Sequence, residues 1–187
     1  MPVNIFEPVT NPVSAETFKG ISFSGHAFVM QWIVQPKGYV PFEHIHLNQE
    51  EIFYVETGEI KVVMDGREFI AKTGESITVP KGMRHIAFNN QESVLNCRVA
   101  YRPGLDYDKF MQCLLGLTKD GILAKNGGVD IPRMGYFLTK MKARCIARPT
   151  AIPAPLFRIA LKVFYLRGVL SGWKKLYDRY TKQESKK

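Results

Sequence analysis

The sequence predicts an all-β domain followed by a helical and strongly basic region, within one chain of 187 residues. Short runs of β-branched and aromatic residues recur from about residue 28 to residue 101, and turn signals separate them at roughly eight- to twelve-residue intervals. After Pro103-Gly104 the spacing of apolar residues changes to that of a helix. This order favours a β-sandwich or barrel and disfavours a parallel α/β fold.

The β-strands can be placed from these runs. Asp65-Gly66 is a dipeptide that favours a tight hairpin turn, and Pro80-Lys81-Gly82 marks a second turn. Residues 1–20 contain three prolines and are expected to form a loop-rich lead-in. The expected strands are 28–34, 51–55, 60–64, 67–71, 76–79, 85–88 and 94–101.

The remainder of the chain predicts three helices. Apolar residues recur at three- and four-residue intervals from Phe110 to Leu117, Met134 to Arg144 can form a second helix, and a third is expected over about 156–180. Between them, residues 148–155 contain three prolines and are expected to be an extended connector. Residues 182–187 are expected to be a frayed tail. The predicted organisation is a lead-in at 1–20, a barrel at 21–104 and a helical extension at 105–187.

Charge divides the chain at the same point. Residues 1–104 carry 9 Lys and Arg against 11 Asp and Glu, whereas residues 105–187 carry 17 against 6. The basic excess permits a nucleic-acid contact, but no recognised binding motif accompanies it, so a nucleic-acid partner is disfavoured. The N-terminus lacks a basic and then apolar leader, and Cys97, Cys113 and Cys145 are an odd count without paired spacing. A reducing, cytoplasmic location is therefore expected.

Three histidines and a glutamate occur at spacings that can build a metal site. Alternate residues of a strand share a face, so His44 and His46 can point to the same side. Glu51 begins the next strand, and the turn at residues 80–82 can bring His85 in from another strand. Neutral imidazoles and a carboxylate suit one divalent transition metal ion: Fe, Mn, Ni, Cu or Zn. His26 is expected to be a surface histidine rather than a further ligand.

These residues lie within two longer patterns. The first is Gly38-x5-His44-x-His46-x4-Glu51-x6-Gly58, and the second is Gly74-x5-Pro80-x-Gly82-x2-His85-x3-Asn89. Both resemble the two signature motifs of the cupin superfamily at every defined position, and the resemblance covers roughly residues 20–103. It implies a double-stranded β-helix, or jelly-roll barrel, like that of small quercetinase-like cupins. It assigns the carboxylate ligand to Glu51, with Glu50 as the fallback. Asn89 is expected to be a turn or hydrogen-bonding residue rather than a ligand.

The resemblance also implies a class of activity. A metal with open coordination positions can hold a small organic molecule through its oxygens, as a non-haem dioxygenase does, and Glu51 could accept a proton as a catalytic residue. The same arrangement suits isomerisation or decarboxylation. The alternative is a module that binds or senses a small ligand without turnover. Five aromatic residues are candidates for the pocket wall, although ordinary packing inside the barrel is the favoured interpretation for any single one: Trp32, Phe42, Phe53, Tyr54 and Tyr101.

The last predicted helix needs an interpretation of its own. Residues 156–180 combine an apolar face with Arg158, Lys162, Arg167, Lys174 and Lys175. We expect the apolar face to pack on the barrel or on a second subunit, and a homodimer is predicted. The other interpretation is a peripheral contact with an anionic membrane or a partner groove.

Overall fold

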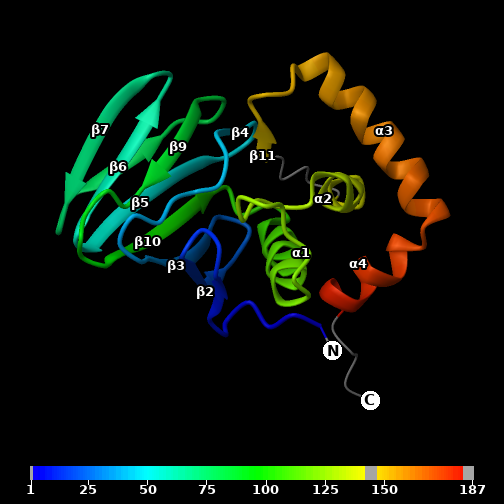
Figure 1. Ribbon diagram of the computed structural model, residues 1–187, viewed down its shortest axis with the longest axis horizontal. Helices are drawn as coiled ribbons and strands as arrows, with labels where there is room; N and C mark the ends of the chain where they lie inside the picture. The colour runs from blue at the N-terminus through cyan, green and yellow to red at the C-terminus, as the bar shows by residue number, and fades with distance from the viewer. Residues whose placement is uncertain (1, 142–146, 183–187) are drawn as a thin grey trace.

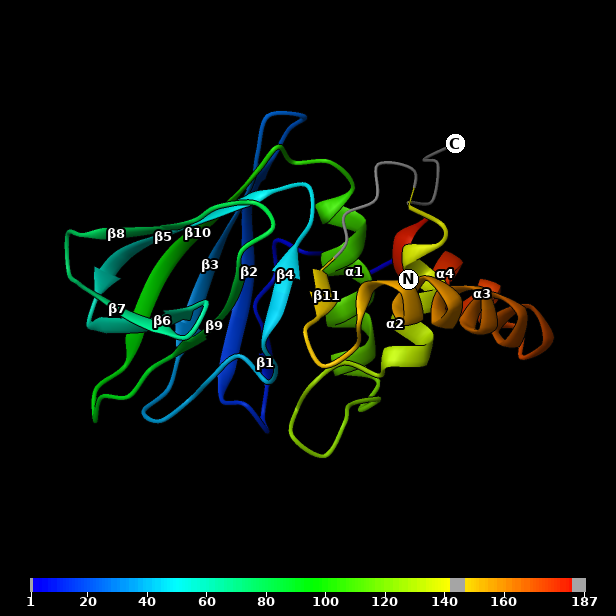
Figure 2. The same cartoon turned by 90° about the horizontal axis from the view of Figure 1, so that it is seen from above.

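The protein is described by a computed structural model, which covers residues 2–141 and 147–182. Two antiparallel sheets face each other and enclose the core, and helices cover one open end of this sandwich (Figures 1 and 2). The six-stranded sheet has the order β1-β2-β3-β10-β5-β8, and the five-stranded sheet has the order β11-β4-β9-β6-β7. The predicted all-β domain with added C-terminal helices is confirmed.

The six-stranded sheet combines the first three strands of the chain with β5, β8 and β10. Along β3 every second residue is buried, as expected for a strand with one face in the core. β10 lies between β3 and β5 and pairs with both. The strands are β1 Val9–Asn11, β2 Glu16–Phe23, β3 Phe28–Val34, β5 Glu50–Thr57, β8 Ser76–Val79 and β10 Leu95–Arg102.

The five-stranded sheet is built around a hairpin. β6 and β7 are joined by Asp65-Gly66, and both residues have positive φ, of 45° and 80°, as the tight hairpin turn requires. β9 pairs with β6 on one side and with β4 on the other. The strands are β4 His44–His46, β6 Glu59–Met64, β7 Arg67–Lys72, β9 Arg84–Phe88 and β11 Ala147–Pro149.

Four helices are described: α1 Tyr107–Lys119, α2 Ile131–Leu138, α3 Ala154–Leu170 and α4 Trp173–Thr181. α1 lies against the open end of the sandwich, and α3 lies outermost in both views (Figures 1 and 2). α3 packs on α2 and α4. Gly168 permits this packing, because a Cβ there would lie 2.1 Å from Cδ2 of Tyr136 on α2.

Several sequence predictions need correction. The lead-in is not merely loop, because β1 and the first five residues of β2 lie within residues 1–20. The third helix is broken, because Gly172 takes a φ of 69° between α3 and α4. The second helix begins and ends earlier than expected, and its predicted end at Arg144 lies outside the described residues. The connector begins as β11, which pairs with β4. Most of the predicted tail also lies outside the described residues.

Candidate metal centre

Strand pairing brings the three histidines together. In β4 the side chains of His44 and His46 are buried and Ile45, between them, is partly exposed, so the two imidazoles share one face. β4 runs antiparallel to β9 with His44 opposite His85, which places the third imidazole beside the first two. Ring centroids are 4.3 Å apart between His44 and His85 and 4.8 Å apart between His44 and His46.

The carboxylate comes from the opposite sheet. Glu51 is the second residue of β5, and its Oε2 lies 2.8 Å from Nε2 of His85 and 3.3 Å from Nε2 of His46. The potential ligand atoms of these four residues all lie within 4.8 Å of one another. Glu50 is half-buried at the start of β5 and lies opposite Arg102. The sequence expectation that the four residues converge therefore agrees with the structure.

The backbone sets the orientation of two imidazoles. Nδ1 of His44 lies 3.2 Å from the carbonyl oxygen of Phe42, and Nδ1 of His85 lies 3.0 Å from that of Met83. A carbonyl only accepts, so each Nδ1 carries a proton. In the neutral ring each Nε2 then directs its lone pair toward the centre of the group, and Nε2 of His85 donates to Glu51 only when that ring is protonated. This is the tautomer in which a histidine can bind a metal through Nε2.

Burial and charge act together on these groups. All four side chains are at most 8% exposed. Burial lowers the pKa of His44, and the neighbouring histidines lower it further. Burial alone would raise the pKa of Glu51, but hydrogen bonds from His46 and His85 outweigh it and hold that pKa well below its usual range. Burial opposes protonation of His85, but its hydrogen bond to Glu51 raises the pKa.

One contact between ring nitrogens fits a cation at the centre. The Nε2 atoms of His44 and His46 lie 3.2 Å apart. Because Nε2 of His44 presents a lone pair, either a proton on His46 or a cation must lie between them. Among the described residues, Nδ1 of His46 has no hydrogen-bond partner although it is buried. A donor set of three imidazoles and one carboxylate fits a divalent transition metal.

The comparison with protein families decides what this barrel is. A family model described as "Cupin domain" matches residues 30–100, which contain all four of these residues. The barrel is a cupin domain. Across almost the whole chain, the protein is similar to a probable oxidoreductase, virH, of Hypocrea virens. The two are 27% identical over 177 residues, covering 84% of this chain and 80% of the relative.

The chain is also similar to parts of several solved structures. The cupin domain of Schizosaccharomyces pombe Cnp3 is 14% identical, with a TM-score of 0.45 over 50% of this chain and 69% of that one. KdgF from Halomonas sp. is 15% identical, with a TM-score of 0.47 over 57% of this chain and 96% of that one. An RmlC-like cupin from Shewanella frigidimarina is 18% identical, with a TM-score of 0.45 over 51% of this chain and 82% of that one.

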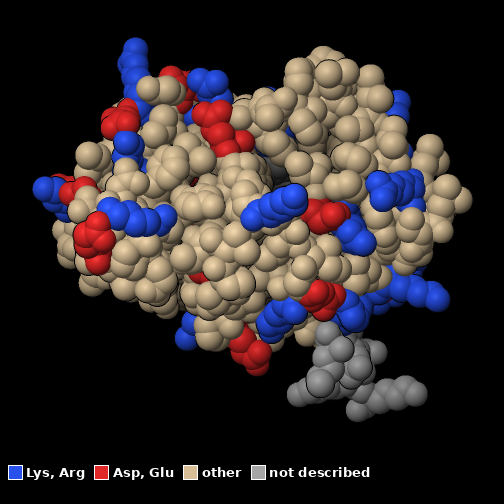
Figure 3. Space-filling model, in the orientation of Figure 1, with Lys and Arg blue, Asp and Glu red and all other residues tan. Residues whose placement is uncertain are grey.

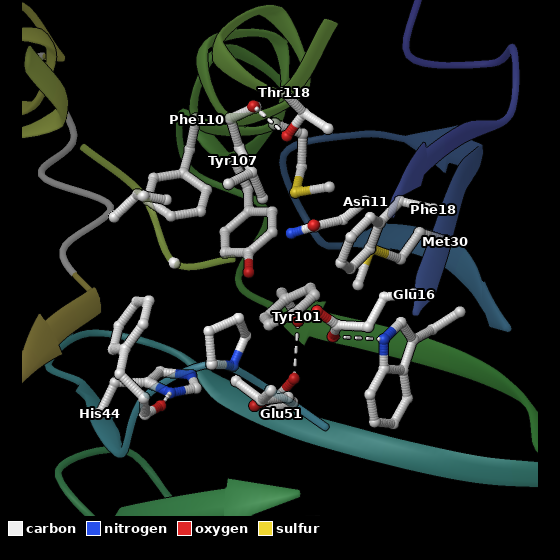
Figure 4. Close-up of a pocket in the computed structure, with 18 of the residues that line it drawn as sticks. Asn11, Glu16, Phe18, Met30, His44, Glu51, Tyr101, Tyr107, Phe110 and Thr118 are labelled. Atoms are coloured by element: carbon white, nitrogen blue, oxygen red, sulfur yellow. Dashed lines mark hydrogen bonds between the residues drawn. The ribbon is translucent and has the colours of Figure 1, made fainter. Parts of the chain in front are cut away.

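The cupin domain encloses a pocket that opens toward α1. His44 and Glu51 lie at one end, and Tyr107 and Phe110 of α1 lie at the other (Figure 4). The remaining wall is mostly apolar, and includes Phe18, Met30, Trp32, Phe42, Phe53 and Met111. Four of the five aromatic residues predicted for the pocket line it. Tyr54 does not, because its ring lies under the guanidinium of Arg98, 5.3 Å away.

Glu16 and Asn11 are among the lining residues that the sequence interpretation missed. Glu16 lies in the predicted lead-in, and Asn11 lies in β1 beside it. The available signal was that Glu16 is in phase with Phe18, which faces the same pocket. Tyr101 was expected only as wall, but its hydroxyl donates a hydrogen bond to Glu51.

The structure also shows where the other residues named from the sequence lie. The Asn89 amide donates to the carbonyl oxygens of Val34, Gln35 and Ser93, so it has the expected hydrogen-bonding role. His26 is exposed, as expected. Cys97 and Cys113 are buried free thiols, and burial raises the pKa of Cys97 to about 12. Cys145 lies outside the described residues.

Proposed function

We propose that this cupin domain binds one divalent transition metal ion through His44, His46, Glu51 and His85. We further propose that it uses the ion for oxidoreductase chemistry on a small organic molecule. The observation that carries the proposal is the convergence of three inward-directed imidazole nitrogens and one carboxylate within 4.8 Å, at the end of an apolar pocket. Similarity to a probable oxidoreductase supports the reaction class.

The residues of the chain have distinct parts in this scheme. When bound, the metal supplies Lewis acidity, and a redox-active metal also supplies electron transfer. The three histidines would hold the ion, and the apolar wall would exclude water from it. Glu51 has one oxygen facing the histidines and the other hydrogen-bonded to Tyr101, so it can accept a proton at the oxygen that faces Tyr101.

A dioxygenase-like reaction is the form we favour within this class, and isomerisation or decarboxylation at the same group are alternatives. A module that binds or senses a small ligand without turnover would use the same residues. Oxygen consumption by the reconstituted protein separates these functions. We expect consumption with at least one compound from a panel of flavonols, diketones and catechols. Ligand binding without turnover under every metal would favour the sensing function.

Metal binding itself is tested by elemental analysis of protein purified without chelator. We expect about one equivalent of metal per chain, and a loss of most of it in His85→Ala. The matched control is His26→Ala, which removes an exposed histidine that is not one of the four proposed ligands. Equal metal content in both variants would overturn the proposed ligand set. The cytoplasmic location and the homodimer stay predictions.

A second candidate function, attachment to an anionic membrane surface, is favoured by the outer face of α3. This helix buries Phe157 and Gly168 against the other helices, but a second apolar stripe faces solvent. The stripe follows helical spacing, and its members recur at intervals of three or four positions. Its members are between 54% and 89% exposed: Leu156, Ile159, Val163, Leu166 and Leu170.

The charge around this stripe favours an anionic membrane surface over a second copy of the chain. Between Asp130 and Asp178 the chain has ten Lys and Arg and no Asp or Glu. On the face shown in Figure 3, the surface over α3 carries Lys and Arg but no Asp or Glu. A second copy of this chain would bring two such basic surfaces together, whereas anionic headgroups would neutralise them while the aliphatic stripe enters the interface. Within the described residues, no helix has the length and apolar content needed to cross a bilayer.

Sedimentation with vesicles tests this attachment. We expect the protein to pellet with vesicles containing about 30% phosphatidylserine, and much less with pure phosphatidylcholine or at high salt. Leu166→Glu with Leu170→Glu should abolish pelleting. The control is Ile70→Glu, at a residue of β7 that is 56% exposed. Pelleting that survives the double substitution would contradict the proposal. So would a stable dimer that this substitution dissociates, because a second copy would then cover α3.

A further inference from the structure

The pocket contains a second buried carboxyl group, separate from the four converging residues. Glu16, the first residue of β2, is 2% exposed and lines the pocket that His44 and Glu51 also line. Figure 4 shows its side chain reaching into the pocket beside Tyr101. Most of the surrounding wall is apolar, so a charge-bearing group at this position is unusual.

Two fixed donors hold this carboxyl group. Nε1 of Trp32 donates to Oε1 over 2.9 Å, and Oγ of Ser14 donates to Oε2 over 2.5 Å. Each oxygen of an ionised Glu16 therefore has a partner without help from water. The neutral form is favoured by burial and the ionised form by the two donors, so the pocket can accommodate both.

These opposing effects place the pKa of Glu16 close to neutrality. Burial is the larger effect and raises the pKa, the hydrogen bonds from Ser14 and Trp32 lower it, and the resulting pKa is about 7. A group with such a pKa can both give and take a proton at physiological pH. The titratable groups that share the pocket are His44 and His46 of β4, Glu51 of β5, Tyr101 of β10 and Tyr107 of α1. β1 and β3 contribute the neutral Asn11 and Trp32 to the wall near Glu16.

We propose that Glu16 is a second acid–base residue of this pocket, which exchanges a proton with an oxygen of a bound substrate. The inference rests on the proposed function, because the substrate would also reach the metal through another of its oxygens. The substrate class is an apolar molecule, flat enough for an aromatic-lined pocket, that carries an enol, phenol or carbonyl oxygen in addition to the metal-binding ones.

The proton transfer balances without any further reactant. The O–H bond of neutral Glu16 breaks, a new O–H bond forms on the substrate oxyanion, and the remaining carboxylate keeps its hydrogen bonds from Ser14 and Trp32. Solvent returns the proton when the product leaves. In the reverse direction, the carboxylate removes a proton from a substrate hydroxyl group.

A purely structural role of Glu16 would give a different result when the residue is replaced by glutamine. If the carboxyl group only anchored the indole and the hydroxyl, glutamine would serve as well. Its amide oxygen can accept from Trp32, and its NH2 group can donate to Oγ of Ser14, which then accepts. Glu16→Gln keeps the size and one accepting oxygen but cannot titrate. The variant therefore separates proton exchange from anchoring.

Tryptophan fluorescence gives a readout that does not depend on activity. The chain has two tryptophans, so Trp173→Phe leaves Trp32, in contact with Glu16, as the only emitter. We expect Trp32 emission to change in one step near pH 7 in the metal-free protein. Glu16→Gln should remove this step, and Glu75→Gln, at an exposed position, should leave it. Should Trp173→Phe disturb folding, the difference between the titrations of the unmodified protein and Trp32→Phe reports the same step.

A chemical probe completes the test. We expect 3-hydroxyflavone, a flat molecule with adjacent oxygens, to bind and to shift the Trp32 step by at least half a pH unit. In the metal-loaded protein, Glu16→Gln should keep its metal but lose about 100-fold in oxygen consumption and lose the pH dependence near 7. A step that persists in Glu16→Gln, or a variant with normal turnover and pH profile, would overturn the role of Glu16. The unmodified protein could instead bind no metal and still show the Trp32 step and its shift with 3-hydroxyflavone. That result would overturn only the proposed function.

Discussion

The hydroxyl group of Tyr101 donates a hydrogen bond of 2.6 Å to Oε1 of Glu51, from the neighbouring strand of the six-stranded sheet. The Tyr101 ring is in turn stacked on Tyr107 of α1, with centroids 3.8 Å apart. One oxygen of the carboxylate is therefore held by the wall of the pocket, while the other faces His85 and His46. The helical region therefore helps to orient Glu51, a proposed metal ligand, because Tyr107 of α1 stacks on the ring of Tyr101.

Replacing Tyr101 by phenylalanine tests this support. The substitution leaves a buried carboxylate oxygen without its donor, which costs about 1–3 kcal/mol. We expect a lower urea midpoint of the metal-free protein and an unchanged metal stoichiometry, since the proposed ligand atoms remain. Tyr54→Phe is the control, because that ring lies outside the pocket under Arg98. Equal midpoints for the two variants would show that the hydrogen bond contributes little.

Metal binding should stabilise the folded chain. A ligand that binds only the native state at about 100 times its dissociation constant adds roughly 2.7 kcal/mol to the free energy of unfolding. We expect the melting temperature to rise when metal is added to chelator-treated protein and to fall again with chelator. His85→Ala should abolish the rise, and His26→Ala should keep it. A rise of the same size in His85→Ala would place the stabilising metal elsewhere.

Glu16 should make stability depend on pH. Its pKa is raised from 4.5 to about 7 by folding, so its stabilising contribution is present below pH 4.5 and is lost as the pH rises through 7. Between pH 5 and pH 8 this amounts to at most about 3 kcal/mol. Chemical denaturation at the two pH values should show a smaller loss in Glu16→Gln than in the unmodified protein. The same loss in both proteins would mean that Glu16 does not titrate in this range.

Gly168 should be intolerant of any side chain. A Cβ at this position would lie 2.1 Å from the Tyr136 ring, so α3 would have to move away from α2. Overpacking of this kind typically costs 1–3 kcal/mol. In Gly168→Ala, we expect faster hydrogen exchange in α3 while the barrel strands stay protected. Leu170→Ala, at a residue that is 89% exposed, should leave exchange unchanged. Unchanged exchange in Gly168→Ala would show that the α2–α3 packing adapts.

The sequence was most informative where local pattern decides structure. The run 28–34 matches β3, because alternation with one buried face is a local property. The convergence of His44, His46 and His85 followed from strand parity and one turn. Glu16 was missed although it is in phase with Phe18, because β1 is three residues long and its pairing with β2 shows that the proline-rich start belongs to the sheet. The pairing of β11 with β4 joins segments about 100 residues apart, which no local pattern encodes.

That last pairing has a consequence for how the two halves of the molecule communicate. In the register, Pro149 stands opposite His44 and Ala147 opposite His46, so the strand that carries two imidazoles is bordered by the segment leading into α3. Thr150 also donates a hydrogen bond to the carboxylate of Glu43, the residue before His44. A displacement of α3 would therefore act on β4 through β11. We expect binding at the outer face of α3 and affinity for the metal ion to be linked, with each changing the other by the same factor.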